Sequence, residues 1–459
     1  MKKEDEMKDK ALEILGNFLG RLCAHKDFTV EDFRLTADYN ESLALGQKEN
    51  ELLGPYNMPS ISKSLTATLY IRWRDKKVSN VNLNYAGIMD FEKEIAGWRE
   101  KAFCDEWAPA VWREDTFDNN DALKYKMYDT EIASVVEGNA QFLFDAIKLI
   151  DSKLKPVSKL ITVNAFASVN RRFIFLGPEA SDPVYDFSFS AAGIAFELDN
   201  QYSDSFIKRR MFTFEDISAL IDKALKYYPA FSVQLDKKEL LPKPAVKNII
   251  LTPSVGESFI NKYILSNLYA KPVVEKQARF SIGDFASQEK HFRDDISIKF
   301  EPDFDEYEIN NIPLTYEGVY CAPVYFVKNG RLQTPILDLK YSKKAEMPPT
   351  AYLSQDTFQS SEYKIKIETG EYECVNNILE DMSEGYIIFD VLGMHTQDHT
   401  SGDFSISAPH AMLIREGKPA GMVKLSISGN FFEILNHHNT KFLNWYGEGD
   451  SMTLKCLCS

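Results

Sequence analysis

The most regular hydrophobic pattern in the chain lies between residues 385 and 435. An apolar run with β-branched and aromatic residues at 386–392 is bounded by glycines and predicts a buried strand. A polar loop follows at 394–402, and apolar and polar residues then alternate from Asp403, which predicts a second strand. Glu416-Gly417 supplies a turn in which glycine can take a positive φ before the alternation resumes. Of these predicted elements, only the loop is rich in groups that could contact a ligand.

The first half of the chain switches between helical and strand periodicity. Apolar residues recur at helical spacing near the N-terminus, and a charged turn at 75–77 separates two alternating stretches, which predicts a hairpin. We expect helices at 8–24, 90–103, 122–154 and 216–228, and strands at 65–74, 78–85, 160–166, 171–176, 185–190 and 193–198. This order predicts a domain that mixes helices and strands.

A polar connector that contains prolines, at 231–247, separates this half from the next, and we place a domain boundary there. A helix is expected at 257–268, after which helical periodicity largely disappears. Asn329-Gly330 between two apolar stretches is a strong hairpin signal. We therefore predict an α+β fold, with an N-terminal mixed α/β domain at 1–240 and a β-rich, barrel-like C-terminal domain at 241–459.

The 459 residues are 44% hydrophobic and 26% charged, an ordinary composition for a globular protein with a large core. The net charge of −15 argues against a nucleic-acid-binding surface, because phosphate binding needs concentrated lysine and arginine. The N-terminus lacks the apolar segment of a signal peptide, and no stretch reaches the roughly eighteen apolar residues of a membrane span, so no membrane association is expected. The six cysteines form no CxxC pair, which fits a reduced, cytoplasmic setting.

Three short motifs follow one another in the second half. They are Thr400-Ser401-Gly402-Asp403-Phe404-Ser405 after the polar loop, Ile414-Arg415-Glu416-Gly417-Lys418 at the hairpin, and Ser428-Gly429-Asn430 at the end of the next strand. Together they resemble the closing half of the TldD/PmbA family, the two-subunit peptidases once called modulators of DNA gyrase. The resemblance is clearest over the last half of the chain. It implies that the chain dimerises and takes an extended peptide into a cavity between subunits.

The resemblance also raises the question of a zinc site. The family's catalytic subunit carries a zinc-binding H-E-x-x-x-H on a helix early in its C-terminal half, completed by a late cysteine, and the glutamate activates water. None of the seven histidines here is followed by glutamate. By hand alignment Asn261, Lys262 and Ser266 stand where the ligands and the base would be, and a lysine would repel the ion. The chain therefore resembles the metal-free PmbA/TldE-like members, so we expect no cofactor in it and zinc in a partner subunit.

The polar loop supplies the candidate binding residues. His395 and His399 lie four apart with Asp398 between them, a spacing that would place both imidazoles on one face of a helix. The glycines that bound the loop argue against a helix, so a metal site, a substrate contact and a solvated loop all stay open. Of the two functional alternatives we favour substrate contact, since a loop beside a sheet edge can hold a peptide added as an extra strand. The candidate substrate-binding residues are His395, Asp398, His399, Ser401 and Asp403, and Asp403 is also expected to orient the loop by accepting backbone N–H bonds.

Several other histidines, acidic residues and cysteines that could bind a metal are interpreted as structural. His437-His438 is interpreted as a loop at a helix end, and the acidic run at 294–306 as a solvated face. Cys456 and Cys458 share one face of a predicted terminal strand and are expected to act as small hydrophobic residues.

The leading hypothesis is a non-catalytic, peptide-binding subunit that acts with a zinc-bearing, TldD-like homologue in the proteolytic processing of peptides or unfolded polypeptide. The chain would work as a heterodimer with that homologue or as a homodimer. Two alternatives stay open: a self-sufficient metallopeptidase with a metal site around His395 and His399, and a non-enzymatic binding or scaffold protein that kept the fold. The missing H-E-x-x-x-H motif leaves open whether the chain is an enzyme.

Overall fold

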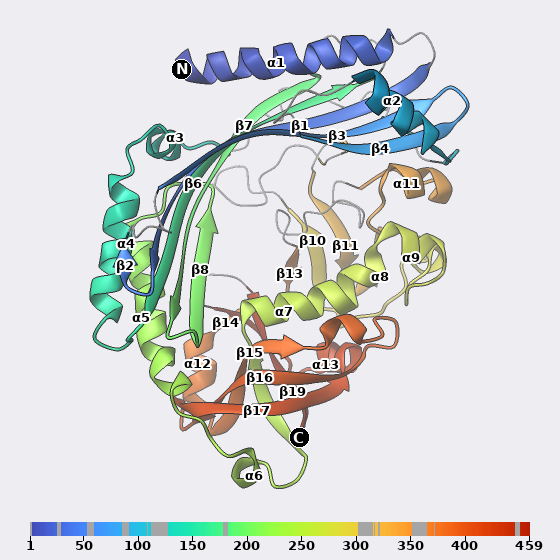
Figure 1. The fold of residues 1–459 in the computed structure, drawn as a ribbon. Helices are drawn as coiled ribbons and strands as arrows, with labels where there is room; N and C mark the ends of the chain where they lie inside the picture. The colour runs from blue at the N-terminus through green and yellow to red at the C-terminus, as the bar shows by residue number, and fades with distance from the viewer. Residues whose placement is uncertain are drawn as a thin grey trace.

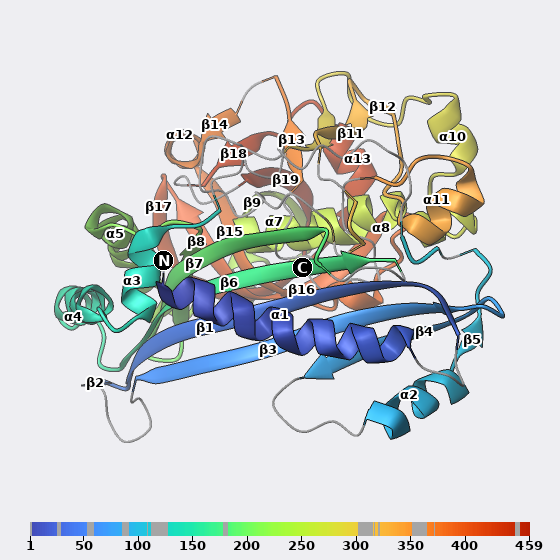
Figure 2. The same cartoon turned by 90° about the horizontal axis from the view of Figure 1, so that it is seen from above.

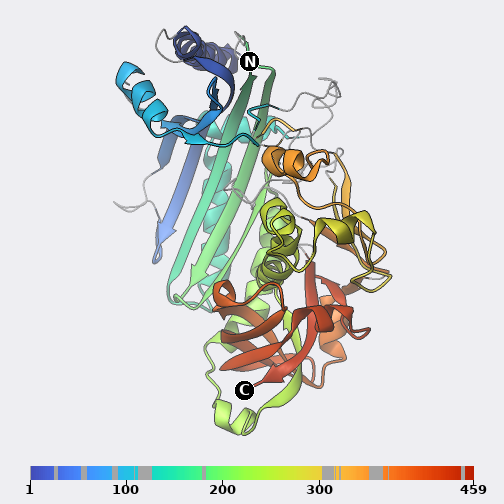
Figure 3. The same cartoon turned by 90° about the vertical axis from the view of Figure 1, so that its right-hand side faces the viewer.

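The chain forms a long curved sheet that arches over a body built from its second half (Figure 1). The structure, a computed structural model, describes residues 2–24, 29–52, 59–84, 91–107, 109–111, 127–177, 182–301, 315, 317–319, 322–350, 365–370, 372–445 and 450–459. Figure 3 shows the body against one side of the long strands, with helix α1 (Lys2–Cys23) at their far end. The predicted α+β fold is confirmed.

The arch is an eight-stranded antiparallel sheet in the order β5-β4-β3-β1-β6-β7-β8, with β2 paired beside β1. Its strands are β1 (Val30–Lys48), β2 (Glu51–Leu52), β3 (Ser60–Trp73), β4 (Lys77–Asn84), β5 (Phe103–Cys104), β6 (Ile161–Leu176), β7 (Tyr185–Leu198) and β8 (Tyr202–Lys208). The predicted hairpin of β3 and β4 is confirmed, with Lys76 at a φ of 65° in its turn.

Helices cover the outer face of this sheet (Figures 1 and 2). α1 lies across β1 and β3, and it meets α2 (Phe91–Glu100) where the rings of Phe18 and Trp98 lie 6.1 Å apart. Further along, α3 (Thr130–Val136), α4 (Gln141–Leu154) and α5 (Phe214–Phe231) pack in one core with β6 and β7. α5 also connects the two parts of the molecule, because Tyr227 stacks on Trp445 with ring centroids 6.0 Å apart.

The strand breaks predicted at 167–170 and 191–192 are wrong, because β6 and β7 each run without interruption. The arginines that interrupt the apolar pattern of β6 pair across the sheet: Arg172 with Asp38 on β1 at 2.7 Å, and Arg171 with Asp186 on β7 at 2.6 Å. In β7, a Cβ on Gly193 would lie 2.7 Å from the Phe166 ring, so this glycine allows close packing and does not end the strand.

The single helix predicted at 122–154 is wrong over its middle, where α3 and α4 are separate helices. Asp129 caps α3 by accepting from the Glu131 backbone N–H, and Gly138 takes a φ of 125° in the connection that follows. Residues 122–126 lie outside the described part of the chain.

The second half is organised around a closed barrel. Strands β9 (Ala245–Leu251), β15 (Glu384–Leu392), β16 (Asp403–Arg415), β17 (Lys418–Asn430) and β19 (Asp450–Cys458) pair in a ring, and the pairing of β19 with β9 completes it. The expected barrel-like domain and its hairpin at Glu416-Gly417 are confirmed. β14 (Tyr372–Cys374) and β18 (Phe442–Asn444) extend this sheet beside β19.

Most of the remaining elements lie beside the barrel and under the arch, whereas α6 lies beyond the barrel, on the side away from the arch (Figure 1). A four-stranded sheet contains β10 (Ser297–Phe300), β11 (Val324–Lys328), β12 (Arg331–Leu332) and β13 (Lys366–Glu368), and its hairpin turns at Asn329-Gly330 as predicted. The helices are α6 (Lys237–Leu240), α7 (Pro253–Phe259), η2 (Ile260–Leu265), α8 (Ser266–Leu268), α9 (Ala270–Val274), α10 (Ile282–Ala286), α11 (Leu339–Ala345), α12 (Val375–Glu380), η3 (Met394–Thr396) and α13 (Phe431–Asn436). No helix within the described residues has the length and apolarity needed to cross a membrane.

Candidate functional site

A helical rod at 253–268 lies between the arch and the barrel and forms one wall of the candidate site (Figure 1). Pro253 starts it at the first helical position, where a missing N–H costs nothing. Its middle, η2, is a π-helix, and both the backbone N–H and the hydroxyl of Ser266 donate to the Asn261 carbonyl. Residues five apart would point roughly 140° apart on an α-helix, but the i→i+5 bonds of the π-turn bring them onto one side.

The rod therefore presents a polar face made of Asn261, Lys262 and Ser266, which are half-buried. The opposite side is apolar, since Tyr263, Ile264 and Leu265 are buried in the barrel core. The sequence alignment placed those three polar residues where a zinc-binding helix would carry its ligands and base. The structure places them together on one face of the rod.

The loop at 393–403 forms the second wall. It opens with Gly393 at a φ of 95°, turns through η3, and reaches β16 after Gly402 at a φ of 83°. Asp398 accepts from both the backbone N–H and the hydroxyl of Thr400, and these bonds lower the pKa of its carboxyl. The Gln397 side chain accepts from the Ser405 backbone N–H at 3.0 Å. The loop is therefore ordered by its own side chains and is not a helix.

Four side chains from the neighbouring segments hold the loop by donating to its backbone carbonyls. They are Lys262 Nζ to His395 O at 3.2 Å, Asn267 Nδ2 to His399 O at 2.7 Å, Arg279 Nη1 to Thr400 O at 3.0 Å and Tyr263 Oη to Asp403 O at 3.2 Å. Burial, together with the charges of Asp403 and Asp398, raises the pKa of Tyr263, which keeps this phenol a donor. The rod and the loop thus form one connected unit.

Asn267 is a fully buried polar member of this unit, with no exposed surface. Its amide also donates to the Tyr263 carbonyl at 2.9 Å, and its side-chain oxygen accepts from the Arg279 backbone N–H at 2.6 Å. Sequence reasoning missed this residue and Arg279. A polar asparagine beside the apolar residues of the predicted helix was the only available signal for the first, and nothing marked the second.

The five candidate residues all lie on this loop, but they differ in exposure. His395 and Asp398 are exposed, whereas His399 is half-buried and its Nε2 is buried without a hydrogen-bond partner among the described residues. The Ser401 hydroxyl accepts from the Asp403 backbone N–H at 3.1 Å. The expected backbone donors to Asp403 are replaced by a side chain, since Asn430 donates to its carboxylate at 2.8 Å.

The described residues give the two loop histidines no third metal ligand. A single group of three histidine, cysteine or acidic side chains in the described part of the chain has its ligand atoms within 4.8 Å of one another, and it consists of Asp284, Glu289 and His291. Among the described residues, the structure thus gives no ligand set of three such side chains around His395 and His399.

The other groups singled out from the sequence have the expected surroundings. The His437 and His438 rings stack 4.5 Å apart after α13, and Cys456 and Cys458 are buried inside the barrel. In the acidic run, Asp294 pairs with Lys290, while residues 302–306 lie outside the described part of the chain.

The family model described as the PmbA/TldA metallopeptidase C-terminal domain matches residues 245–446, which include the rod, the loop and most of the barrel. Residues 245–446 thus contain a domain of this kind, which confirms the resemblance to the TldD/PmbA family over this part of the chain. The chain is 22% identical over 313 residues to an uncharacterized protein of Methanocaldococcus jannaschii, an alignment that covers 65% of this chain and 71% of that protein.

Solved structures of similar proteins have the same fold over the whole chain. TldE from Thermococcus kodakarensis matches with a TM-score of 0.67 at 16% identity and covers 98% of this chain and 99% of its own. A candidate modulator of DNA gyrase from Bacteroides thetaiotaomicron matches with a TM-score of 0.67 at 13% identity, over 100% and 99% of the two chains. Another from Thermotoga maritima matches with a TM-score of 0.65 at 16% identity, over 99% of each. The arch, for which the sequence offered little resemblance, is thus shared as a fold.

Proposed function

We propose that this chain is a peptide-binding subunit of a TldD/PmbA peptidase that contributes no zinc ligands, and that a zinc-bearing homologue supplies the chemistry. The observation that carries the proposal is the polar face of the rod. The π-turn has the shape that an H-E-x-x-x-H motif needs, because it brings residues five apart onto one side. An amide, an ammonium and a hydroxyl occupy that face, at Asn261, Lys262 and Ser266.

This donor set is unsuited to Zn²⁺. Zinc sites in proteins use imidazole, thiolate and carboxylate ligands, and a neutral amide and a hydroxyl are poor substitutes. The Lys262 ammonium adds a positive charge next to the position that the ion would occupy. The same ammonium binds the loop instead, through the His395 carbonyl. This face of the rod supports the loop and does not activate water.

The loop has the properties of a binding surface. Its backbone is held by four side-chain donors, while His395 and Asp398 remain exposed. Leu392, directly before the loop, is 58% exposed and offers an apolar contact beside these polar groups. A rigid loop with mixed chemistry next to a strand is suited to an extended peptide, which binds through backbone hydrogen bonds and side-chain contacts.

The test measures hydrolysis of a quenched fluorescent peptide library by the chain alone and after co-expression with its nearest H-E-x-x-x-H homologue. The isolated chain should be inactive with or without added zinc, and the co-purified complex should be active. In the complex, a His395→Ala, Asp398→Ala double variant should raise KM at least several-fold with little change in kcat, because it removes binding and not chemistry. The matched control is Asp294→Ala, which removes an exposed carboxylate outside the loop.

Two outcomes would contradict the proposal. Hydrolysis by the isolated chain that is lost with His395→Ala or His399→Ala would make it a metallopeptidase of its own. Failure to co-purify with any such homologue, together with no peptide binding by the chain, would leave a scaffold that kept only the fold.

A further inference from the structure

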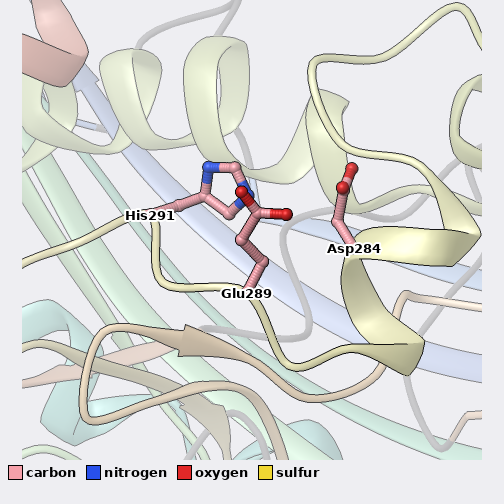
Figure 4. A group of neighbouring side chains, drawn as sticks. All are labelled: Asp284, Glu289 and His291. Atoms are coloured by element: carbon pink, nitrogen blue, oxygen red, sulfur yellow. The ribbon is translucent and has the colours of Figure 1, made fainter.

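A second polar cluster lies outside the rod and the loop, on the segment that leads from α10 to β10. Asp284, Glu289 and His291 each offer a ligand atom, and these atoms lie within 4.8 Å of one another. Figure 4 shows the Glu289 carboxylate next to the imidazole of His291, with Asp284 on the far side of that carboxylate. None of the three belongs to the sequence motifs that carry the family resemblance.

The backbone of this segment is fixed by the neighbouring hairpin and by α13. Gln288 takes a φ of 52°, which turns the chain so that the Glu289 N–H donates back to the Asp284 carbonyl. The His291 N–H donates to the Gly330 carbonyl at 2.9 Å, and the Asn436 amide donates to the His291 carbonyl at 3.0 Å. The three side chains are therefore presented by a rigid turn.

The side chains are oriented as well. Both the backbone N–H and the hydroxyl of Ser281 donate to Oδ2 of Asp284, at 2.7 Å and 2.9 Å, which sets the plane of this carboxylate while occupying one of its oxygens. The His291 ring lies 4.8 Å from the ring of Phe280. Its Nε2 is buried and has no hydrogen-bond partner among the described residues.

A buried imidazole nitrogen without a partner is costly, because the polar atom has lost water and gained nothing in exchange. In Figure 4 the ring nitrogen remote from the backbone points toward the carboxylates, so its lone pair and their oxygens converge on one place. A cation there would satisfy the nitrogen and both carboxylates at once.

We propose that Asp284, Glu289 and His291 bind one Zn²⁺ ion. One imidazole nitrogen and two carboxylate oxygens form a ligand set that Zn²⁺ accepts, with the fourth position open to water on the side of the exposed Glu289. Ca²⁺ takes six to eight oxygen ligands, and Mg²⁺ keeps an all-oxygen octahedron, so an imidazole ligand disfavours both. The ion would join α10 to the segment at 289–291, whose backbone is hydrogen-bonded to the β11–β12 hairpin, and its role would be structural.

The experiment is zinc titration of the full chain in competition with a chromophoric chelator, with the melting temperature recorded in parallel. The wild type should bind one equivalent of zinc and melt at a higher temperature with it. His291→Gln should weaken binding by at least about tenfold and abolish the shift in melting temperature. Glu289→Gln should do the same, and because this side chain is exposed its replacement leaves the core intact. His438→Gln and Asp294→Asn, the matched controls, should bind as the wild type does.

The proposal is overturned if the wild type binds no zinc at about 100 µM, or if His291→Gln and Glu289→Gln bind it as tightly as the wild type does. It is also overturned if a hundredfold excess of Ca²⁺ or Mg²⁺ displaces the zinc. The test is separate from that of the peptide-binding role, since zinc lost with His291→Gln and retained with His395→Ala belongs to this site alone.

Discussion

The Lys262 ammonium donates to the carbonyl oxygen of His395 across 3.2 Å. Lys262 stands on the rod at the position that the sequence resemblance assigns to the base of a zinc-binding motif, and His395 stands on the loop that we propose binds peptide. One contact therefore links the two parts of the site. It also explains why a cation is accommodated at this position, since a backbone carbonyl in the loop is an acceptor for it.

Replacing Lys262 by methionine keeps the length of the side chain and removes the donor. Without this bond the loop should open more often, because a hydrogen bond from a charged donor stabilises by about 1.5–3 kcal/mol when well formed and less when exposed. We expect amides at 394–400 to exchange hydrogen about tenfold faster. Mass-spectrometric hydrogen exchange would show this, with Lys271→Met on the exposed side of α9 as the control. Unchanged protection in this loop would mean that Lys262 does not hold it.

Asn267→Ala should be far more damaging than any change on the loop surface. The asparagine is fully buried, and its loss leaves the Tyr263 and His399 carbonyls and the Arg279 N–H short of a partner. Each unsatisfied buried group costs about 1–3 kcal/mol, so we expect a loss of about 3 kcal/mol or more. Urea unfolding measures it, and Asn439→Ala, an exposed position after α13, should stay within about 0.5 kcal/mol of the wild type. Equal losses in the two variants would contradict this account.

Local patterns predicted much of this fold. The hairpins at Asn329-Gly330 and Glu416-Gly417 and the strand at 386–392 are set by neighbouring residues, and all three are present, although the strand is buried only as far as Ile388. The breaks predicted within β6 and β7 were wrong because their causes are not local. The charge on Arg172 looks like an interruption until Asp38, 134 residues away, is placed opposite it.

In the candidate site, too, features set by neighbouring residues could be predicted, whereas contacts between residues distant in sequence could not. Its loop residues are close in sequence, so a single motif can group them. The residues that hold the loop are not: Asn267 and His399 are 132 residues apart, and Arg279 and Thr400 are 121 apart. The cluster of Asp284, Glu289 and His291 was missed for another reason. Its spacing matches no common metal motif, and only the turn at Gln288 brings the three side chains together.

Two glycines of the loop offer a matched comparison. Gly402 and Gly393 both have a positive φ, but a Cβ on Gly402 would lie 2.4 Å from Cδ2 of Phe432, whereas one on Gly393 would meet nothing closer than 4.0 Å. Gly393→Ala should therefore cost only the backbone strain, about 1 kcal/mol. Gly402→Ala adds a clash with a buried ring and should cost about 3 kcal/mol or more. Denaturant unfolding of the two variants gives the difference directly, and similar losses would contradict the close packing at Phe432.

The acid sensitivity of the arch should depend on Asp216, which caps α5. Burial alone would raise the pKa of this carboxyl, but hydrogen bonds from Arg210, Lys208 and the Thr213 N–H outweigh it and hold the pKa well below its usual range. Because the folded-state pKa is depressed, the stabilisation is present above the unfolded pKa of about 3.9 and is lost as the pH falls below it.

Asp216→Asn should therefore unfold at lower urea than the wild type at pH 7, and the gap between the two should shrink as the pH is lowered from about 5 toward 3. Asp222→Asn, on the exposed side of the same helix, is the control and should follow the wild type at every pH. A gap between Asp216→Asn and the wild type that stays constant over this range would show that the variant acts through a lost helix cap and not through the charge of the carboxylate. A gap that widened as the pH fell would contradict the depressed pKa of the Asp216 carboxyl.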